Sequence, residues 1–503
     1  MPLEPVQVDL SRLTTRQSLS RYNLDSRLDN VINNGVGLES VYGQRLVHDL
    51  AKKKYGSLQD SDIGLLIKDG SEVRSMFLTS IGRDVIDTES PSGGVNKGNA
   101  FVCVGSRVYK IFGDSQEPWL CGYVNNALGP VHWAESQNQN TAEVFLYLTD
   151  KSISGLFRLN ILDIYPAIQP IGNELPYVNG SSTEKAKPAF ISFRGHRLLL
   201  SCENSTQFFF SVLNPDGAAR GGMFPAANFY ATETKADRTV RVIGLDVVYA
   251  FGSQTAEVWR DNNDAYNPYT TSINGNRLEG MLFPDVVALR GNELYYFDNY
   301  RRLCRMSGGR HEVLSDRAME RAWDGKLFSN AFTIYANGCF IACFQDSAGF
   351  TIGYNTRSNS VSELSCLKNV RAAQGGMLCS RDGKLCEFDD SSCTMAGGEV
   401  ISKSVQFEVL NSHNHFSLRL VEIDYSMQTV PDGSPLNNQA FLFVSPDGLE
   451  WSDARVISLD SHEKTIKEYG FGLCHKMQAR ILFTNSSPVV FNSATFHIQG
   501  ARK

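Results

Sequence analysis

The sequence predicts an all-β protein: a β-propeller of six or seven blades, with a C-terminal β-sandwich and an N-terminal, partly helical arm. Three observations support this fold class. Hairpin-like segments recur at a nearly constant spacing in the middle of the chain, other strand-like segments follow them, and the first 94 residues lack the repeat. The expected domains are therefore residues 1–94, 95–396 and 397–503.

The repeated unit is a glycine or turn residue between two short runs of β-prone residues, as in LRGNELYYFDN at 289–299. Six such segments centre on Gly105, Gly195, Gly244, Gly291, Gly338 and Gly383. The last five glycines lie 49, 47, 47 and 45 residues apart, and the 90-residue interval before them contains a further hairpin-like stretch around Asp150 and Lys151. A strand-and-turn period of about 40 to 50 residues is typical of a propeller blade of four strands.

Both faces of these hairpins are apolar, as in Leu294–Phe297. A single blade cannot bury both of its faces alone, so neighbouring blades must stack around an axis. The alternative is a pair of unrelated β-sandwiches whose hairpins happen to be evenly spaced. The blade number stays open at six or seven because strands from both ends of a chain often combine to close such a ring.

The segments outside the repeat differ from it in character. Leu38, Val41, Leu46 and Leu50 fall at helical spacing, which predicts a helix over about residues 38–55. The residues before this helix contain few large apolar side chains and are expected to form an extended arm. After about residue 397, segments such as LRLVEIDYSM, QAFLFVSP and MQARILF predict the strands of an antiparallel sandwich.

Composition and charge exclude several classes of protein. The 503 residues include 48 Lys and Arg against 54 Asp and Glu, a formal charge of −6 without a strong block, so no basic face for dedicated nucleic-acid binding is expected. The sequence shows neither a signal peptide nor an apolar window long enough for a membrane span. Eleven cysteines without a CxxC pair favour reduced core thiols in a cytosol-like compartment.

No constellation in the sequence indicates catalysis, a cofactor or a metal site. GxSxG, Walker and HExxH motifs are absent from the sequence. One hairpin is rich in arginine, and its candidate contacts to DNA in a channel are Arg301, Arg302, Arg305 and Arg310. The alternative is a solvated blade edge whose charges oppose edge-to-edge strand pairing.

A series of short motifs in the central third closely resembles the packaged-DNA stabilisation proteins, the tail hub or nozzle proteins, of short-tailed bacteriophages (podoviruses). The C-terminal segments AFLFVSPDGLEWSDARVISL and MQARILFTNSSPVVFNSATFHIQ are also similar to the end of that family. The resemblance covers residues 240–325 well and 437–499 fairly. In chain order, the central motifs are Phe251-Gly252, Glu257-Val258-Trp259, Asn267-Pro268-Tyr269, Glu279-Gly280, NELYYFD, and Ser315–Glu320 before Trp323.

The resemblance implies a structural virion protein in the viral tail, assembled in the host cytoplasm. Its implied form is a homo-hexameric ring below the portal and adaptor proteins. The ring retains packaged DNA, contacts the genome transiently during DNA ejection, and carries tail fibres or spikes and a needle or plug. The family implies no catalytic residues. The long N-terminal segment departs from the family pattern, which leaves the adaptor contact undefined.

Two other classes of function are weighed against the tail hub. A glycan-binding or glycan-cleaving β-propeller would need two or three acidic residues and an arginine cluster in one pocket. An interaction propeller of the WD type would be expected to repeat Gly-His and Trp-Asp dipeptides, and this chain does not.

Overall fold

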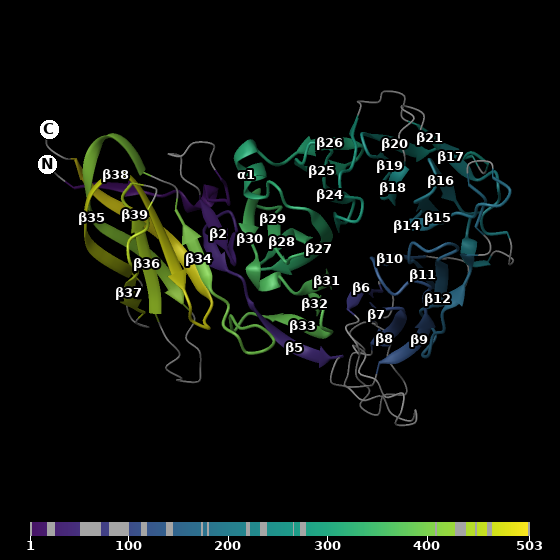
Figure 1. The fold of residues 1–503 in the computed structure, drawn as a ribbon, viewed down its shortest axis with the longest axis horizontal. Helices are drawn as coiled ribbons and strands as arrows, with labels where there is room; N and C mark the ends of the chain where they lie inside the picture. The colour runs from purple at the N-terminus through teal and green to yellow at the C-terminus, as the bar shows by residue number, and fades with distance from the viewer. Residues whose placement is uncertain are drawn as a thin grey trace.

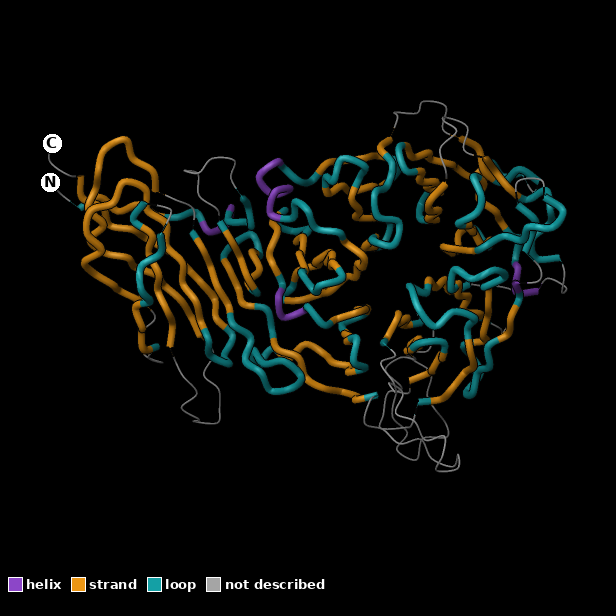
Figure 2. The backbone as a smooth tube through the Cα atoms, in the orientation of Figure 1, coloured by secondary structure: helices purple, strands orange, loops and turns teal. Residues whose placement is uncertain are grey.

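The computed structural model describes residues 3–17, 26–50, 72–79, 100–111, 118–136, 144–172, 175–178, 181–217, 222–231, 239–264, 266–271, 278–407, 410–427, 439–447, 450–459 and 465–500. A ring of β-sheets adjoins a β-sandwich (Figure 1), and strands dominate the backbone (Figure 2). The described helical segments are short: α1 (Arg317–Ala322), η1 (Leu10–Arg12), η3 (Pro215–Gly217) and η4 (Ser365–Leu367). None of the helices in the described residues is long and apolar enough to cross a membrane.

The ring contains seven blades within the described residues, each built on four antiparallel strands. Blade one contains β6 (Val73–Leu78), β7 (Ala100–Val104), β8 (Arg107–Ile111) and β9 (Trp119–Tyr123). Blade two contains β10 (His132–Glu135), β11 (Phe145–Thr149), β12 (Leu156–Asn160) and β13 (Gln169–Pro170). Blade three contains β14 (Pro188–Arg194), β15 (Arg197–Cys202), β16 (Gln207–Phe210) and β17 (Phe229–Ala231).

The next two blades come from the segment that carries the family resemblance. Blade four contains β18 (Thr239–Gly244), β19 (Val248–Gly252), β20 (Thr255–Asp261) and β21 (Tyr269–Thr271), with β22 (Leu278–Glu279) also paired to β20. Blade five contains β23 (Val287–Arg290), β24 (Glu293–Phe297), β25 (Leu303–Ser307) and β26 (Arg310–Val313). Blade six contains β27 (Phe328–Ala336), β28 (Cys339–Asp346), β29 (Thr351–Asn355) and β30 (Ser360–Glu363).

Blade seven closes the ring with a strand from the N-terminal part of the chain. Its first three strands are β31 (Val370–Gln374), β32 (Met377–Ser380) and β33 (Lys384–Asp389), and its outer strand is β5 (Gly43–Asp49). The pairing of β5 with β33 runs from Asp389 opposite Gly43 to Lys384 opposite Asp49. In Figure 1 this purple strand lies beside the green strands of blade seven. The prediction of a propeller is confirmed, with seven blades.

The predicted hairpins fall one in each blade, but not at the same place in every blade. In blades three to six the turn joins the first and second strands, whereas in blades one, two and seven it joins the second and third. Gly195 and Gly291 have φ of 55° and 53°, a left-handed conformation that glycine adopts at little cost. The near-constant spacing therefore indicates that each blade contains one such turn, although the turn does not join the same pair of strands in every blade.

Alternate residues of a blade strand pack against different neighbours. On β24, Tyr295 and Phe297 join a buried cluster with residues of blade six, including Phe344. Leu294 and Tyr296 join residues of blade four, including Phe251. This two-sided burial explains why the strand is apolar on both faces and why no blade could fold alone.

The sandwich combines C-terminal strands with strands from the N-terminal segment. Its strands are β34 (Lys403–Gln406), β35 (Leu410–Met427), β36 (Gln439–Ser445), β37 (Arg455–Ser458), β38 (Thr465–Phe483), β39 (Val489–Gly500), β1 (Glu4–Gln7), β3 (Val31–Asn33) and β4 (Leu38–Ser40). The strand β38 pairs with β35 along its first part and with β34 and β36 along its last part, so it takes part in both sheets. β2 (Arg27–Asp29) pairs with β34 and with β30 of blade six, which joins the two domains.

Two expectations for the N-terminal segment are wrong. Residues 38–50 form β4 and β5 instead of a helix; Leu38 and Val41 are buried between sheets, while Leu46 is 40% exposed. Residues 51–55 lie outside the described part. The boundary at residue 94 is also displaced, because β5 and β6 belong to blades seven and one. The partner of β5 lies more than 300 residues away, so no local pattern marks residues 43–49 as a strand. The apolar residues within 38–50 fall at helical spacing by chance, and this spacing led to the wrong prediction of a helix.

Candidate functional site

The four arginines predicted to contact DNA lie on the outer half of blade five. They belong to β25, β26 and the turn before β25, whereas β23 is the strand of this blade that lines the central cavity. Arg302 binds Asp298 at 2.7 Å, and Arg305 binds Glu312 at 2.6 Å and Glu293 at 3.2 Å. Arg310 is exposed, and the Arg301 carbonyl accepts a hydrogen bond from the Trp323 indole. The charges of Arg302 and Arg305 are therefore balanced within the hairpin.

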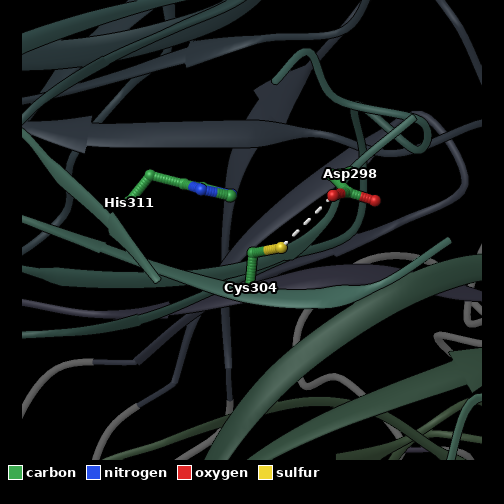
Figure 3. A group of neighbouring side chains, drawn as sticks. All are labelled: Asp298, Cys304 and His311. Carbon is green, nitrogen blue, oxygen red and sulfur yellow. Dashed lines mark hydrogen bonds between the residues drawn. The ribbon is translucent and has the colours of Figure 1, made fainter. Parts of the chain in front are cut away.

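The buried Asp298 and Cys304 and the partly buried His311 form a cluster on the same blade (Figure 3). Their nearest ligand-type atoms all lie within 4.8 Å of one another. No sequence motif indicates this group, because spacings of six and seven residues match no metal-binding pattern.

The polar contacts of this cluster favour a structural role. The Asp298 carboxylate is fully buried and accepts hydrogen bonds from the Tyr300 and Arg302 backbone N–H groups, from the Arg302 guanidinium and from the Cys304 thiol. Burial, and then the nearby Asp298 charge, raise the pKa of Cys304, so the thiol is protonated. Arg302 already supplies the positive charge that a metal ion would bring, and a thiol is a poor ligand until it loses its proton.

A second group of polar and charged residues lies in the central channel, where the innermost strands of the blades converge. The channel cavity has a volume of about 340 Å³, and its polar lining comes from β6, β10, β18, β27, β31 and the segment before β23. The residues concerned are Arg74, His132, Arg241, Asp285, Asn330, Arg371 and Gln374. Residues from six blades thus face one space.

Asp285 connects opposite sides of this channel. Its carboxylate accepts hydrogen bonds from Lys151 Nζ at 2.8 Å and 2.9 Å and contacts His132 Nε2 at 3.0 Å, although both partners belong to blade two. Phe190 of blade three packs against this group: its ring centroid lies 4.4 Å from that of His132 and 4.7 Å from the Arg241 guanidinium. Four blades are therefore joined by one ionic and aromatic cluster.

Burial sets the protonation of the channel residues. It lowers the pKa of His132 to about 4, against a partial opposing effect of Asp285, so the imidazole is neutral at pH 7. Burial would raise the pKa of Asp285, but the hydrogen bonds with His132 and Lys151 and the positive charge of Lys151 outweigh it and lower this pKa. The ionised Asp285 is held chiefly by Lys151. Burial also lowers the pKa of Arg241 to about 10, which leaves the guanidinium charged at neutral pH.

All eleven cysteines are buried and none forms a disulfide. Cys339 and Cys343 belong to the same core cluster, on the face of β28 that packs beside blade seven. Burial raises the pKa of Cys343, so this thiol is not an activated nucleophile.

Comparison with known proteins gives fold-level similarity only. No protein-family model matches the sequence, and no curated protein matches it. Among solved structures, the chain is similar to BamB from Moraxella catarrhalis, with 10% identity over 77% of this chain and 98% of that chain, at a TM-score of 0.37. It is also similar to the WD40 repeats of RRP9, with 8% identity over 74% of this chain and 92% of that chain, at a TM-score of 0.35. The function must therefore be argued from the chain itself.

Proposed function

We propose that this chain is a structural virion protein, the tail hub or nozzle of a short-tailed bacteriophage. In this role it docks below the portal and adaptor, retains packaged DNA and provides attachment sites for tail fibres or spikes and for a needle or plug. The observation that carries the proposal is the ordered series of motifs between residues 240 and 325. These residues build two consecutive blades and the helix that leads to the next one.

The motif residues have architectural roles in this fold. Trp259 is 2% exposed and packs against Tyr230, with ring centroids 4.8 Å apart. A Cβ atom on Gly280 would lie 2.5 Å from the Gln254 backbone nitrogen, which explains why glycine stands there. Asp316 caps α1 by accepting hydrogen bonds from the backbone N–H groups of Ala318 and Met319. A resemblance carried by such residues supports a shared scaffold rather than a shared catalytic site.

An exposed apolar patch on the outer rim supports a role in assembly. It consists of Trp119 of blade one and Leu162, Ile164 and Tyr165 of blade two, which are 41%, 44%, 46% and 58% exposed. The rings of Trp119 and Tyr165 lie 4.6 Å apart, and the Trp119 indole donates a hydrogen bond to the Pro166 carbonyl. The buried Lys110 donates hydrogen bonds to the carbonyls of Asp163 and Ile164. Large apolar side chains in a fixed arrangement are typical of protein interfaces.

The channel offers less support for the glycan-cleaving alternative. Glycoside hydrolysis generally uses two carboxyl groups on opposite sides of the scissile bond. Among the described residues that line the channel, Asp285 is the single carboxylate, and it is bound to Lys151 and His132. Its low pKa suits an ion pair better than a general acid.

Light scattering with and without a portal–adaptor complex tests the proposal. We expect the isolated chain to be mainly monomeric at micromolar concentration and to form six-copy rings on the complex, because six adjacent sites raise its effective concentration. A chain that stays monomeric in the presence of the complex would contradict the hub assignment. A stable free hexamer would instead contradict the docking-driven step.

Variants can show whether the rim patch takes part in assembly. The double change Trp119→Ala and Tyr165→Ala should reduce ring formation at least tenfold while leaving the monomer folded. Tyr266→Ala is the matched control, because Tyr266 is an aromatic residue of blade four that is 88% exposed. Equal ring formation by both variants would remove the patch from the assembly interface.

A further inference from the structure

The described residues that line the central channel carry more positive than negative charge. Arg74, Arg241 and Arg371 line the cavity, and Asp285 is the single carboxylate among its described lining residues. Lys151 already pairs with Asp285 at 2.8 Å. Glu203 lies 4.0 Å from Lys151 Nζ, but it is 46% exposed and does not line the cavity. Among the described residues that line this space, three guanidinium groups therefore accompany a single carboxylate.

Arg74 contributes positive charge to the channel, but its N–H groups are not available to bind a ligand. Its guanidinium is buried and donates hydrogen bonds to the carbonyls of Gly105, Asn126, Leu128 and Gly129. These neutral acceptors satisfy its N–H groups but leave its full positive charge in place. Such a buried cation makes the electrostatic potential of the channel more positive.

Arg241 and Arg371 are better placed to bind a ligand. Arg241 donates from Nη1 to the Pro284 carbonyl, while its Nε is buried and has no hydrogen-bond partner in the described residues. Arg371 donates from Nε to the Arg74 carbonyl at 3.3 Å. Burial and the neighbouring Arg381 lower the pKa of Arg371, and the carboxylates of Glu72 and Asp285 partly offset this effect. Asp285, the single carboxylate among the described residues that line the cavity, is already bound to Lys151.

The walls around these arginines are fixed by hydrogen bonds. The Asn330 amide donates to the Arg371 carbonyl, and the Gln374 amide exchanges two hydrogen bonds with the backbone of Leu78, each at 2.9 Å. Phe190 lies under the Arg241 guanidinium and limits its movement. A preformed site loses little conformational entropy when a ligand enters.

We propose that the propeller channel binds a small multivalent oxyanion, a phosphate-type or carboxylate-type group, between Arg241 and Arg371. Guanidinium groups form charge-assisted, often bidentate hydrogen bonds with the oxygens of both groups. The 340 Å³ cavity has room for a molecule of the size of pyrophosphate or citrate. Such an anion would balance the surplus charge and tie blades four and seven together across the channel. This inference does not depend on the proposed assembly function.

Calorimetric titration of the full chain with pyrophosphate and with citrate tests the inference, with chloride at matched ionic strength as the reference. We expect saturable 1:1 binding of at least one of the two anions. Preference for pyrophosphate would identify a phosphate-type ligand, and preference for citrate a carboxylate-type ligand. Absence of saturable binding of both at millimolar concentration would overturn the inference.

Substitutions locate the binding in the channel. Arg241→Gln and Arg371→Gln should each weaken binding at least tenfold, and Arg371→Lys should restore part of it if Arg371→Gln folds poorly. Arg310→Gln is the matched control, because it removes the same charge from the exposed outer strand of blade five. Equal weakening by Arg310→Gln and the channel variants would show that the anion responds to net charge alone and would overturn the assignment of the site.

Discussion

Two groups of arginines in this propeller differ in how their charges are balanced. On the outer hairpin of blade five, Arg302 and Arg305 lie beside acids of the same blade, at 2.7 Å from Asp298 and 2.6 Å from Glu312. In the channel, Arg74, Arg241 and Arg371 come from three different blades, and Asp285, the single carboxylate among the described lining residues, is bound to Lys151. Arg302 and Arg305, which are close together in the sequence, are thus paired with acids of their own blade. The excess positive charge of the channel lining arises only when the ring brings the three channel arginines together.

The largest expected effect comes from opening the ring, because only a closed ring brings the channel residues together. Deletion of residues 1–50 removes β5, whose six pairings with β33 complete blade seven. We expect the melting temperature to fall by more than about 10 °C, since an unpaired β33 exposes its backbone and the apolar face below it. Differential scanning calorimetry provides the measurement. A peptide of residues 43–50 should restore part of the loss, and an unchanged melting temperature would contradict the role of β5.

The next largest effect should come from the buried carboxylate of the outer hairpin. Asp298→Ala removes four hydrogen bonds, made by Tyr300, Arg302 and Cys304, and leaves Arg302 with Glu279 at 4.0 Å as its nearest acid in the described residues. We expect a loss of about 3 kcal/mol in the free energy of unfolding, measured by urea denaturation. Asp298→Asn, which keeps the acceptor for the turn, should cost less. A loss below about 1 kcal/mol for Asp298→Ala would mean that this ion pair does not order the hairpin.

A pH-dependent effect tests the burial of His132 in the channel. Burial lowers the pKa of His132 in the folded chain to about 4 from its ordinary value of 6.5, so protonation favours the unfolded chain. The stability contributed by the neutral imidazole is complete above pH 6.5 and is lost as the pH falls from 6.5 to 4, by about 3 kcal/mol. Urea denaturation across this range should give a shallower decline for His132→Asn than for the original chain. Parallel curves would show that His132 is not buried in its neutral form.

The smallest effect is expected on the exposed part of the hairpin. Arg305 is 38% exposed and its partner Glu312 is 54% exposed. Arg305→Gln should therefore change the free energy of unfolding by less than about 1 kcal/mol, because solvent screens such pairs. Urea denaturation beside Asp298→Ala gives the comparison. A loss as large as that of the buried carboxylate would contradict the distinction between paired surface arginines and a buried anchor.

The sequence predicts what is local in this fold. One turn per blade, at Gly195, Gly291 and the related positions, was sufficient to predict the propeller, because each blade contains a similar hairpin formed by residues that are close in sequence. The pairing of Arg305 with Glu312 could also be predicted from the sequence, since the two residues lie opposite each other on one short hairpin. Strand register, rather than the number of arginines, was the informative signal there.

The long-range features were not predictable in the same way. The partner of β5 lies more than 300 residues further along the chain, and the apolar positions around it happen to match a helix. His132, Arg241 and Asp285 come from separate blades, and each looks ordinary within its own segment. Only closure of the ring places them around one cavity, so a pattern read along the chain cannot identify the channel site.

The position of this chain in an assembled particle is the most direct test of its proposed function. Single-particle electron microscopy of a purified tail, or of the chain bound to a portal–adaptor complex, would show it. We expect six copies of a seven-bladed propeller with its sandwich, arranged as a ring below the adaptor and around the path of the DNA. Tails that are complete without this chain, or a single copy away from the tail axis, would contradict the account.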